Sequence, residues 1–241
     1  MAVQLGVNLD HIATIRQVRG VSYPKPLDGA HICEELAVHG VTLHLREDRR
    51  HIQEYDVIEI KKILTHCTLN LEMALSEEVI EFARKIHPYM ATIVPERREE
   101  LTTEGGLDVK QNFNRIATLC RDFHERGILV SLFIEADKDA VKLSKECGAD
   151  YIEIHTGAYA DSSGEKQKAE LTRIFDAAEY AVSLGLRVNA GHGLNYENTV
   201  PVLAMKGLEE VNIGHSIIAR AVIVGLTQAI REMKDLLERG V

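Results

Sequence analysis

The sequence alternates short aliphatic runs with longer helical segments, and this alternation limits the possible folds more than any other feature. Strands that alternate with helices build parallel sheets from βαβ units. We predict eight strands, which are Gln4–Asn8, Val41–Leu45, Thr68–Met73, Ala91–Val94, Leu129–Ile134, Tyr151–His155, Arg187–Ala190 and Glu210–Ile213. Eight such units in 241 residues favour a closed α/β fold, the (β/α)8 TIM barrel, over an open sheet.

Residues 1–241 are predicted to form a single barrel domain, because no linker or low-complexity stretch interrupts them. Capping signals mark several helices: Ser76 stands before two glutamates, and Gly148 follows a helical pattern. The segments Val109–Arg126 and Leu226–Gly240 supply more helix than a minimal barrel needs. We therefore expect additional helices beyond the basic eight.

The composition excludes several classes of partner. A formal net charge of −9 argues against binding to nucleic acid or to an anionic membrane surface. No run of about 18 apolar residues is present, so we expect no membrane span, and the first residues show no secretory signal. The four cysteines form no C-x-x-C pair and are expected to be free thiols in a reducing compartment. The sequence therefore predicts a cytoplasmic protein.

Six of the eight predicted strands have one apolar face and one polar face. Along Val41–Arg46, aliphatic residues occupy one face, while Thr42, His44 and Arg46 occupy the other. The same alternation groups Asn8, Asp10, Asn70, Glu72, Glu153, His155, Asn189 and Asn212 on polar faces. Parallel strands are usually apolar on both faces, and an unsatisfied buried polar group costs about 1–3 kcal/mol. The polar faces are therefore predicted to line the barrel interior near its C-terminal mouth.

Charged residues follow several strands directly. The segment from His44 to His51 contains Arg46, and we expect Arg46 and His51 to bind an anion rather than to form only a solvated loop. Two acids, Glu96 and Glu135, follow the fourth and fifth predicted strands. Each of these acids is expected either to enter the site or to face solvent.

Glycine-flanked histidines follow the last two strands. Gly191-His192-Gly193 and Gly214-His215-Ser216 stand where many barrels hold a phosphate on backbone N–H groups. The run Thr102-Thr103-Glu104-Gly105-Gly106 lies in a long loop, where it predicts a lid, a phosphate contact or a plain turn. No lysine or cysteine occupies the C-terminal end of a predicted strand, which argues against an enzyme-bound imine or a thiol nucleophile. Histidine and glutamate remain as proton-transfer groups.

The chain closely resembles the pyridoxine 5′-phosphate synthase family, which closes the pyridine ring in the deoxyxylulose 5-phosphate-dependent route to vitamin B6. The matching segments are Gly6–Arg19, Val41–Ile52, Asn70–Ala74, Val94–Arg98, Leu101–Asp108, Ser131–Ile134, Ile152–Asp161, Leu184–Leu194 and Val211–Gly225. They run through the whole chain, and several are long enough to be specific, such as GVNLDHIATIRQVR. The resemblance implies a barrel with extra helices.

The resemblance also implies an activity and a set of residue roles. The family condenses 1-deoxy-D-xylulose 5-phosphate with 3-amino-2-oxopropyl phosphate and releases phosphate and water. His44 would act as a general base, Glu72 as a general acid–base and His192 as a general acid. The amino ketone phosphate would be held by Asn8, Arg19, Gly193, Gly214 and His215. The deoxyxylulose phosphate would be held by Asp10, His11, Arg46, His51 and Thr102.

Further expectations follow from the resemblance. The enzyme would be a homo-octamer that acts on small phosphorylated substrates and needs no metal and no cofactor. Glu153, His155 and Asn189 receive no role from it, and only the alternation of faces places them in the site. A metal-dependent barrel hydrolase or lyase, with His44, Glu72, His192 and His215 as ligands, is the rival enzyme. A non-catalytic protein that binds a phosphate ligand is the second alternative.

Overall fold

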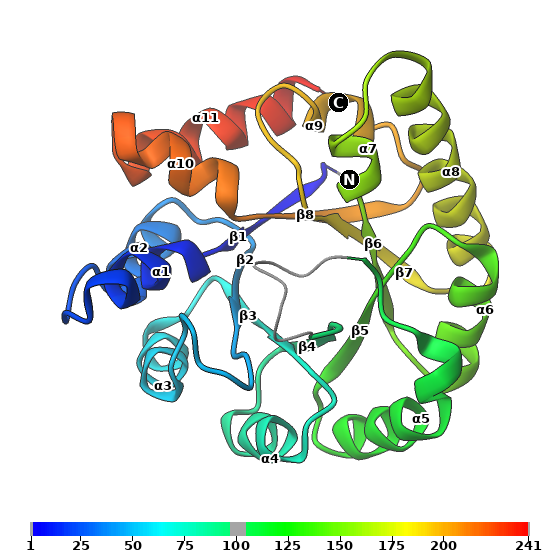
Figure 1. Ribbon diagram of the computed structural model, residues 1–241, viewed down its shortest axis with the longest axis horizontal. Coiled ribbons are helices and arrows are strands. Elements are labelled where there is room, and N and C mark those ends of the chain that lie inside the picture. Colours follow the sequence, from blue (N-terminus) through cyan, green and yellow to red (C-terminus); the bar gives the residue numbers. More distant parts are fainter. Residues whose placement is uncertain (1, 97–104, 241) are drawn as a thin grey trace.

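The computed structural model describes residues 2–96 and 105–240, which form a closed barrel of parallel strands surrounded by helices (Figure 1). The strands pair in sequence order, and β8 closes the barrel against β1. They are β1 (Gln4–Asn8), β2 (Gly40–His44), β3 (Thr68–Met73), β4 (Met90–Ile93), β5 (Leu129–Ile134), β6 (Tyr151–His155), β7 (Arg187–Gly191) and β8 (Leu208–Ile213). The prediction of a (β/α)8 TIM barrel is confirmed.

Strand boundaries agree with the sequence to within one or two residues at each end. β2 starts at Gly40, which lies in register with Gly6 and with Thr68. Glycine is not a residue typical of strands, so this strand was predicted to begin one residue later, at Val41. Asp10 differs more: it was assigned to the polar face of a strand, but it is the first residue of helix α1. The chain turns there because the Asp10 N–H donates to the Asn8 side-chain oxygen at 2.9 Å.

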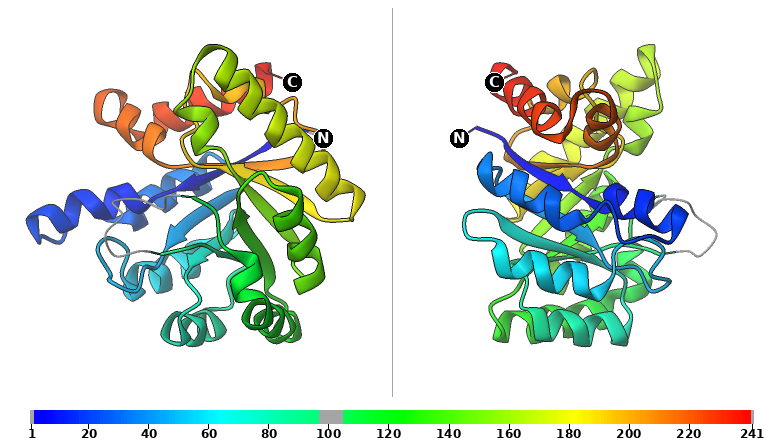
Figure 2. Two further views of the ribbon diagram at one scale, coloured as in Figure 1. Left: turned by 45° about the vertical axis from the view of Figure 1, so that its right-hand side comes forward. Right: turned by 90° about the vertical axis from the view of Figure 1, so that its left-hand side faces the viewer.

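The helices surround the barrel, and two helices stand in each of two connections, β1 to β2 and β6 to β7, and again after β8. In the described residues they are α1 (Asp10–Arg19), α2 (Pro26–Glu35), α3 (Glu54–Ile63), α4 (Glu77–Ile86), α5 (Val109–Glu125), α6 (Lys138–Cys147), α7 (Gly157–Ala160), α8 (Gly164–Ser183), α9 (Thr199–Val202), α10 (His215–Val224) and α11 (Leu226–Arg239). Figure 2 shows α10 and α11 side by side, in agreement with their direct contact. The expected additional helices are therefore present.

Two predicted helix caps have the geometry that their residue types favour. The Ser76 side chain accepts the N–H of Val79 at the start of α4. Gly148 ends α6 in the left-handed conformation, with φ at 88°. These local signals determine where the chain leaves one helix and enters the next element.

The two faces of the strands differ as predicted. The aliphatic residues, such as Leu43, Leu71 and Ile152, are fully buried in a core between the strands and the helices. Two inward positions are glycines that make room for polar neighbours. A Cβ atom on Gly6 would lie 2.1 Å from an Asn212 oxygen, and one on Gly191 would lie 2.2 Å from a Glu153 oxygen. The interior is therefore packed around polar side chains.

A hydrogen-bond chain crosses the interior from β4 to β6. The Thr92 hydroxyl donates to Asn70, whose amide donates to the Thr42 hydroxyl. Thr42 donates to Asn212, and the Asn212 amide donates to a Glu153 oxygen at 2.8 Å. Every donor in the chain points toward Glu153. Because these polar groups hydrogen-bond to one another, the free-energy cost of burying them is offset.

Other expectations concern the helices and the thiols. Within residues 2–96 and 105–240, no helix is long and apolar enough to cross a bilayer.

The cysteines Cys33, Cys67, Cys120 and Cys147 are free and buried. Burial raises the pKa of the Cys67 and Cys120 thiols to about 12, so both are unreactive at neutral pH.

Candidate active site

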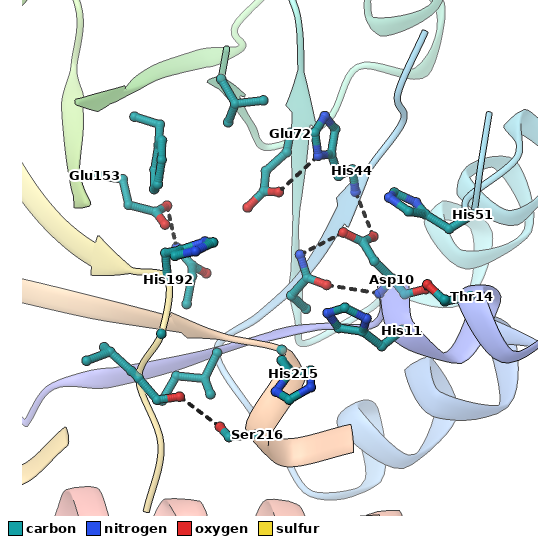
Figure 3. A pocket seen from close by; sticks show the side chains of 18 of the residues that line it. Asp10, His11, Thr14, His44, His51, Glu72, Glu153, His192, His215 and Ser216 are labelled. Carbon is teal, nitrogen blue, oxygen red and sulfur yellow. Dashed lines mark hydrogen bonds and ion pairs between the residues drawn. The ribbon is translucent and has the colours of Figure 1, made fainter. Parts of the chain in front are cut away.

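A cavity of about 540 Å³, lined mostly by residues with polar side chains, opens at the C-terminal ends of the strands (Figure 3). Its volume lies in the range that small-molecule sites occupy. The predicted site residues in its wall are Asn8, Asp10, His11, His44, Arg46, His51, Glu72, Glu153, His192, Gly193, Gly214 and His215. They come from β1, α1, β2 and the segment after it, β3, β6, the turns after β7 and β8, and the start of α10, so distant parts of the chain meet around one space.

Four predicted residues have other positions. Arg19 is exposed at the last position of α1 and does not belong to the cavity wall. His155 is buried beside the cavity. Asn189 faces a small space at the N-terminal ends of the strands, together with Glu210. Thr102 lies outside the described residues.

Asp10 organises the ends of β1 and β2. One of its oxygens accepts the backbone N–H of His44 at 2.9 Å, and the other accepts the Asn8 amide at 2.9 Å. Because Asn8 also accepts the Asp10 N–H, the two side chains hold each other in place. Thr14 lies one helical turn after Asp10 and also lines the cavity. The start of α1 therefore forms one wall.

His44 and Glu72 are register partners on β2 and β3, and their side chains meet in the cavity (Figure 3). His44 Nδ1 lies 3.7 Å from Glu72 Oε2. Burial raises the pKa of Glu72 well above its usual range, and the charges of Asp10 and Glu153 raise it further. The raised pKa favours the protonated form of Glu72, which can exchange its proton with a group in the cavity.

Glu96 lies in the site, beside His44, and does not face solvent. The sequence had left both positions open for it. Its side chain is 7% exposed, and its Oε1 lies 2.8 Å from His44 Nε2. Its second oxygen accepts the backbone N–H of Glu47 at 3.0 Å. These hydrogen bonds outweigh burial and lower the pKa of the Glu96 carboxyl. His44 thus stands between two carboxyl groups.

Glu135 contacts His155, although its side chain is 38% exposed and does not line the cavity. The Glu135 Oε1 atom lies 2.7 Å from His155 Nδ1 and accepts the backbone N–H of Gly106 at 3.0 Å. The His155 ring lies 5.0 Å from the ring of His192, centroid to centroid. The pair therefore supports His192 from behind the cavity wall.

Glu153 is the second protonatable acid of the cavity. Burial raises its pKa to about 8, and the hydrogen bond from Asn212 opposes part of that rise. Asn212 also lines the cavity, although it was absent from the predicted site set. The strand alternation had already placed Asn212 inward, so that signal was sufficient to find it. Phe133 is a further wall residue, and no comparable pattern in the sequence indicates it.

His192 has an unusual backbone, with φ at 76°. The Thr156 hydroxyl donates to its carbonyl oxygen at 2.5 Å and so supports this turn. Burial and the neighbouring His155 lower the pKa of His192 to about 4, against the opposing effect of Asp161. At neutral pH, His192 is therefore uncharged in this structure.

The turns after β7 and β8 bring backbone close to the cavity. Gly193 has φ at 77°, and a Cβ atom there would lie 2.6 Å from the Cβ of Ala160. A Cβ atom on Gly214 would approach the Asn8 side chain to 2.9 Å. The helix α10 begins at His215, in the wall itself. Free N–H groups of a helix start beside glycine turns suit a phosphate group.

Cationic and imidazole groups gather on the opposite wall. Arg46 is 2% exposed and lines the cavity with Arg50 and His51. Burial lowers the pKa of His51 and of His11, and Asp10 acts against this in both cases. Buried imidazoles that are held neutral gain a proton readily when an anion arrives. This wall can therefore receive a second phosphate.

The structure groups a different set of candidate metal ligands from the predicted set. Among the described residues, donor atoms of Asp10, His44 and His51 lie within 4.8 Å of one another. Zinc–nitrogen bonds of about 2.1 Å place tetrahedral ligand atoms about 3.4 Å apart. Both Asp10 oxygens already accept hydrogen bonds. These three residues are the ligand group on which a metal site would rest.

Solved structures confirm the fold. The phosphoribosyl anthranilate isomerase of Thermus thermophilus aligns over 96% of this chain and all of its own, with a TM-score of 0.60 and 13% identity. The tryptophan synthase A-subunit of Pyrococcus furiosus aligns over 98% of this chain and 96% of its own, with a TM-score of 0.61 and 10% identity. At such low identity the likeness shows the shared barrel alone.

Sequence comparisons identify the family. A pyridoxine 5′-phosphate synthase of Idiomarina loihiensis is 50% identical over 239 residues, which cover 99% of this chain and 98% of that protein. Its counterpart in Coxiella burnetii is 52% identical over 236 residues, with 98% of each chain covered. The family described as "Pyridoxal phosphate biosynthesis protein PdxJ" matches residues 5–239. The chain therefore belongs to the PdxJ family of pyridoxal phosphate biosynthesis proteins.

Proposed function

We propose that the protein is a pyridoxine 5′-phosphate synthase that condenses 1-deoxy-D-xylulose 5-phosphate with 3-amino-2-oxopropyl phosphate. Full-length relatives at about half identity carry this name. The amino ketone supplies its own amine, so the chemistry needs no lysine at a strand end. The remaining steps are imine formation, enolisation and the loss of phosphate and water. Each of them is a proton transfer or an elimination that positioned acids and bases accelerate, by roughly 10²–10⁴-fold for each group.

We assign the proton transfers to three groups in the cavity wall. His44 accepts a proton from the substrate, and Glu72, whose pKa is raised, gives or takes one beside it. His192 delivers a proton to a leaving group. Its pKa of about 4 suits this role only after a phosphate dianion binds next to it, because a nearby negative charge favours the imidazolium form.

We place the two phosphate groups on opposite walls. The amino ketone phosphate lies against Gly193, Gly214 and His215, at the start of α10. The deoxyxylulose phosphate lies near Arg46 and His51, with Asp10 and His11 on its sugar-like chain, and Thr102 is proposed as a further contact. Asn8, which also lines the cavity, is proposed as a further contact of the amino ketone phosphate. This arrangement places the reacting amine and ketone near the His44–Glu72 pair.

The observation that carries the proposal is the 3.7 Å approach of Glu72 to His44, in a cavity whose other walls hold groups that suit anions. The test is to mix both substrates with the purified protein and to detect pyridoxine 5′-phosphate by chromatography. Sustained formation of the product supports the proposal. Folded protein that forms no product would remove it, and binding without turnover would indicate a phosphate-binding protein instead.

A metal-dependent hydrolase or lyase is the second candidate, and it rests on the group of Asp10, His44 and His51. Elemental analysis together with activity before and after chelation separates the two enzymes. Equal product formation in both samples supports acid–base catalysis without a metal. A stoichiometric ion whose removal abolishes turnover would favour the metal enzyme.

We further propose a homo-octamer of single-domain subunits in the cytoplasm. Exposed apolar side chains occur on two neighbouring helices, with Val18 of α1 79% exposed and Val222 and Ile223 of α10 71% and 77% exposed. Such a patch is typical of a surface that another subunit covers. Arg19 stands beside Val18, so an assembly that buries this surface could bring Arg19 to a substrate. The free buried thiols suit a reducing compartment.

A further inference from the structure

Glu96 connects the end of β4 to the end of β2. It follows β4 by three residues, and its carboxyl group extends past β3 to reach His44 Nε2 at 2.8 Å. The other oxygen accepts the backbone N–H of Glu47 at 3.0 Å. Both oxygens therefore have a partner at the end of β2, which holds the carboxyl group in one orientation.

The Glu96 contact decides which nitrogen of His44 carries a hydrogen. An ionised carboxylate can only accept hydrogen bonds. The 2.8 Å contact therefore requires the hydrogen to lie on His44 Nε2. When the imidazole is neutral, its lone pair is then on Nδ1, the atom that faces Glu72 Oε2 at 3.7 Å.

We propose that Glu96 is a positioning residue that fixes His44 as the Nε2–H tautomer, so that Nδ1 is the atom that accepts the substrate proton. This inference rests on the proposed function. A carboxylate that orients a catalytic imidazole in this way also stabilises the imidazolium that forms during proton transfer. The 3.7 Å between His44 and Glu72 exceeds a hydrogen bond, so the two groups act on a substrate atom between them.

The first test is Glu96→Gln, which keeps the size of the side chain and removes its charge. The amide can accept from His44 or donate to it, so the tautomer is no longer fixed. We expect kcat to fall by about 10–100-fold, while KM for each substrate stays within about threefold. The acid limb of the pH profile of kcat/KM should move to lower pH, because the imidazolium form of His44 loses its ionised partner.

Two further variants make the result specific. Glu47→Gln removes an exposed carboxylate at the same place and keeps the backbone N–H that Glu96 accepts, so its kcat and pH profile should match those of the unsubstituted enzyme. Glu96→Asp keeps the charge and shortens the side chain. It should lose less activity than Glu96→Gln and keep the position of the acid limb, which provides a test if the glutamine variant does not fold.

The tautomer itself can be measured on protein labelled with ¹⁵N-histidine. The His44 signals, identified by their loss in His44→Gln, should show a protonated Nε2 in the unsubstituted enzyme and a mixed state in Glu96→Gln. An unchanged tautomer and an unchanged acid limb in a folded Glu96→Gln variant would overturn the inference. Absence of product from the unsubstituted enzyme would instead overturn the proposed function, so the two failures are distinguishable.

Discussion

Arg16 and Asp56 form a buried, two-pronged ion pair that ties α1 to α3, with both N–O distances at 2.7 Å. Each residue is 2% exposed. Arg16 also donates to the backbone carbonyl of His51 at 3.1 Å, so the pair supports one wall of the cavity. Removing one partner leaves an uncompensated charge in the interior, which is strongly destabilising.

We predict that Asp56→Asn lowers the free energy of unfolding by about 3–5 kcal/mol, as measured by urea denaturation. The KM for the substrate that His51 contacts should rise as well. Glu59→Gln is the matched control, because Glu59 is exposed on the same helix and its loss should change neither quantity. A fully stable Asp56→Asn variant would mean that the ion pair contributes nothing to the fold.

Glu153 makes the stability of the fold depend on pH. Its pKa of about 8 in the folded state exceeds that of an unfolded glutamate, so the folded state binds more protons between these values. Stability should therefore fall as pH rises from about 5 to 8, by at most about 1.4 kcal/mol per pH unit for this group. Glu153→Gln should flatten the dependence in urea titrations, and the exposed control Glu125→Gln should not. Parallel curves for all three proteins would contradict the prediction.

Glu72→Gln should abolish most of the turnover and retain substrate binding. The amide keeps the shape of the protonated acid but cannot release its proton, so kcat should fall by about 10²–10⁴-fold. Calorimetry with 1-deoxy-D-xylulose 5-phosphate should give a nearly unchanged dissociation constant. Loss of the thermal unfolding transition would mean that Glu72 is needed for folding rather than for proton transfer.

Gly193→Ala tests the close approach of backbone at the proposed phosphate site. An alanine at φ 77° costs about 1–2 kcal/mol, and its Cβ would also collide with Ala160 at 2.6 Å. The KM for the amino ketone phosphate should rise by about 5–30-fold. Adding Ala160→Gly removes the collision but not the backbone cost, so it should restore part of the loss. Complete restoration would show that the left-handed backbone is unimportant.

The apolar surface of α10 should determine the oligomeric state. Val222→Asp combined with Ile223→Asp places charges on this surface and should produce smaller species in sedimentation velocity experiments. Val200→Asp makes the same kind of change on α9, where the side chain is 39% exposed, and should leave the assembly intact. A protein without these substitutions that sediments as a monomer would exclude the proposed octamer.

The fold was predictable because each strand is rich in aliphatic residues and its side chains alternate between two faces. Thr68–Met73 and Leu129–Ile134 have the predicted boundaries, since polar turns or glycine bound them on both sides. The interior positions Thr92 and Ser131 obey the same alternation, although small hydroxyl residues between aliphatic ones gave a weaker signal than glutamate or histidine.

The site was less completely predictable because alternation gives the face of a residue and not its depth. Glu153 and Asn189 are register partners, yet only Glu153 reaches the cavity. Its longer side chain extends toward the C-terminal ends, into the space that Gly191 leaves. Glu96 and Glu135 could not be placed from the sequence, because each lies beyond the end of its strand, where the alternation of faces no longer applies.

The hydrogen-bond chain from Thr92 to Glu153 restricts how this interior can evolve. Its three inner side chains, Asn70, Thr42 and Asn212, each accept one hydrogen bond and donate the next, so replacing any of them by an aliphatic residue leaves both of its neighbours without a partner in the chain. A barrel in which only some of these polar residues have been replaced by aliphatic ones is therefore less stable than a barrel that keeps them all or replaces them all. Descendants of this barrel should acquire new chemistry through their loops long before their centre changes.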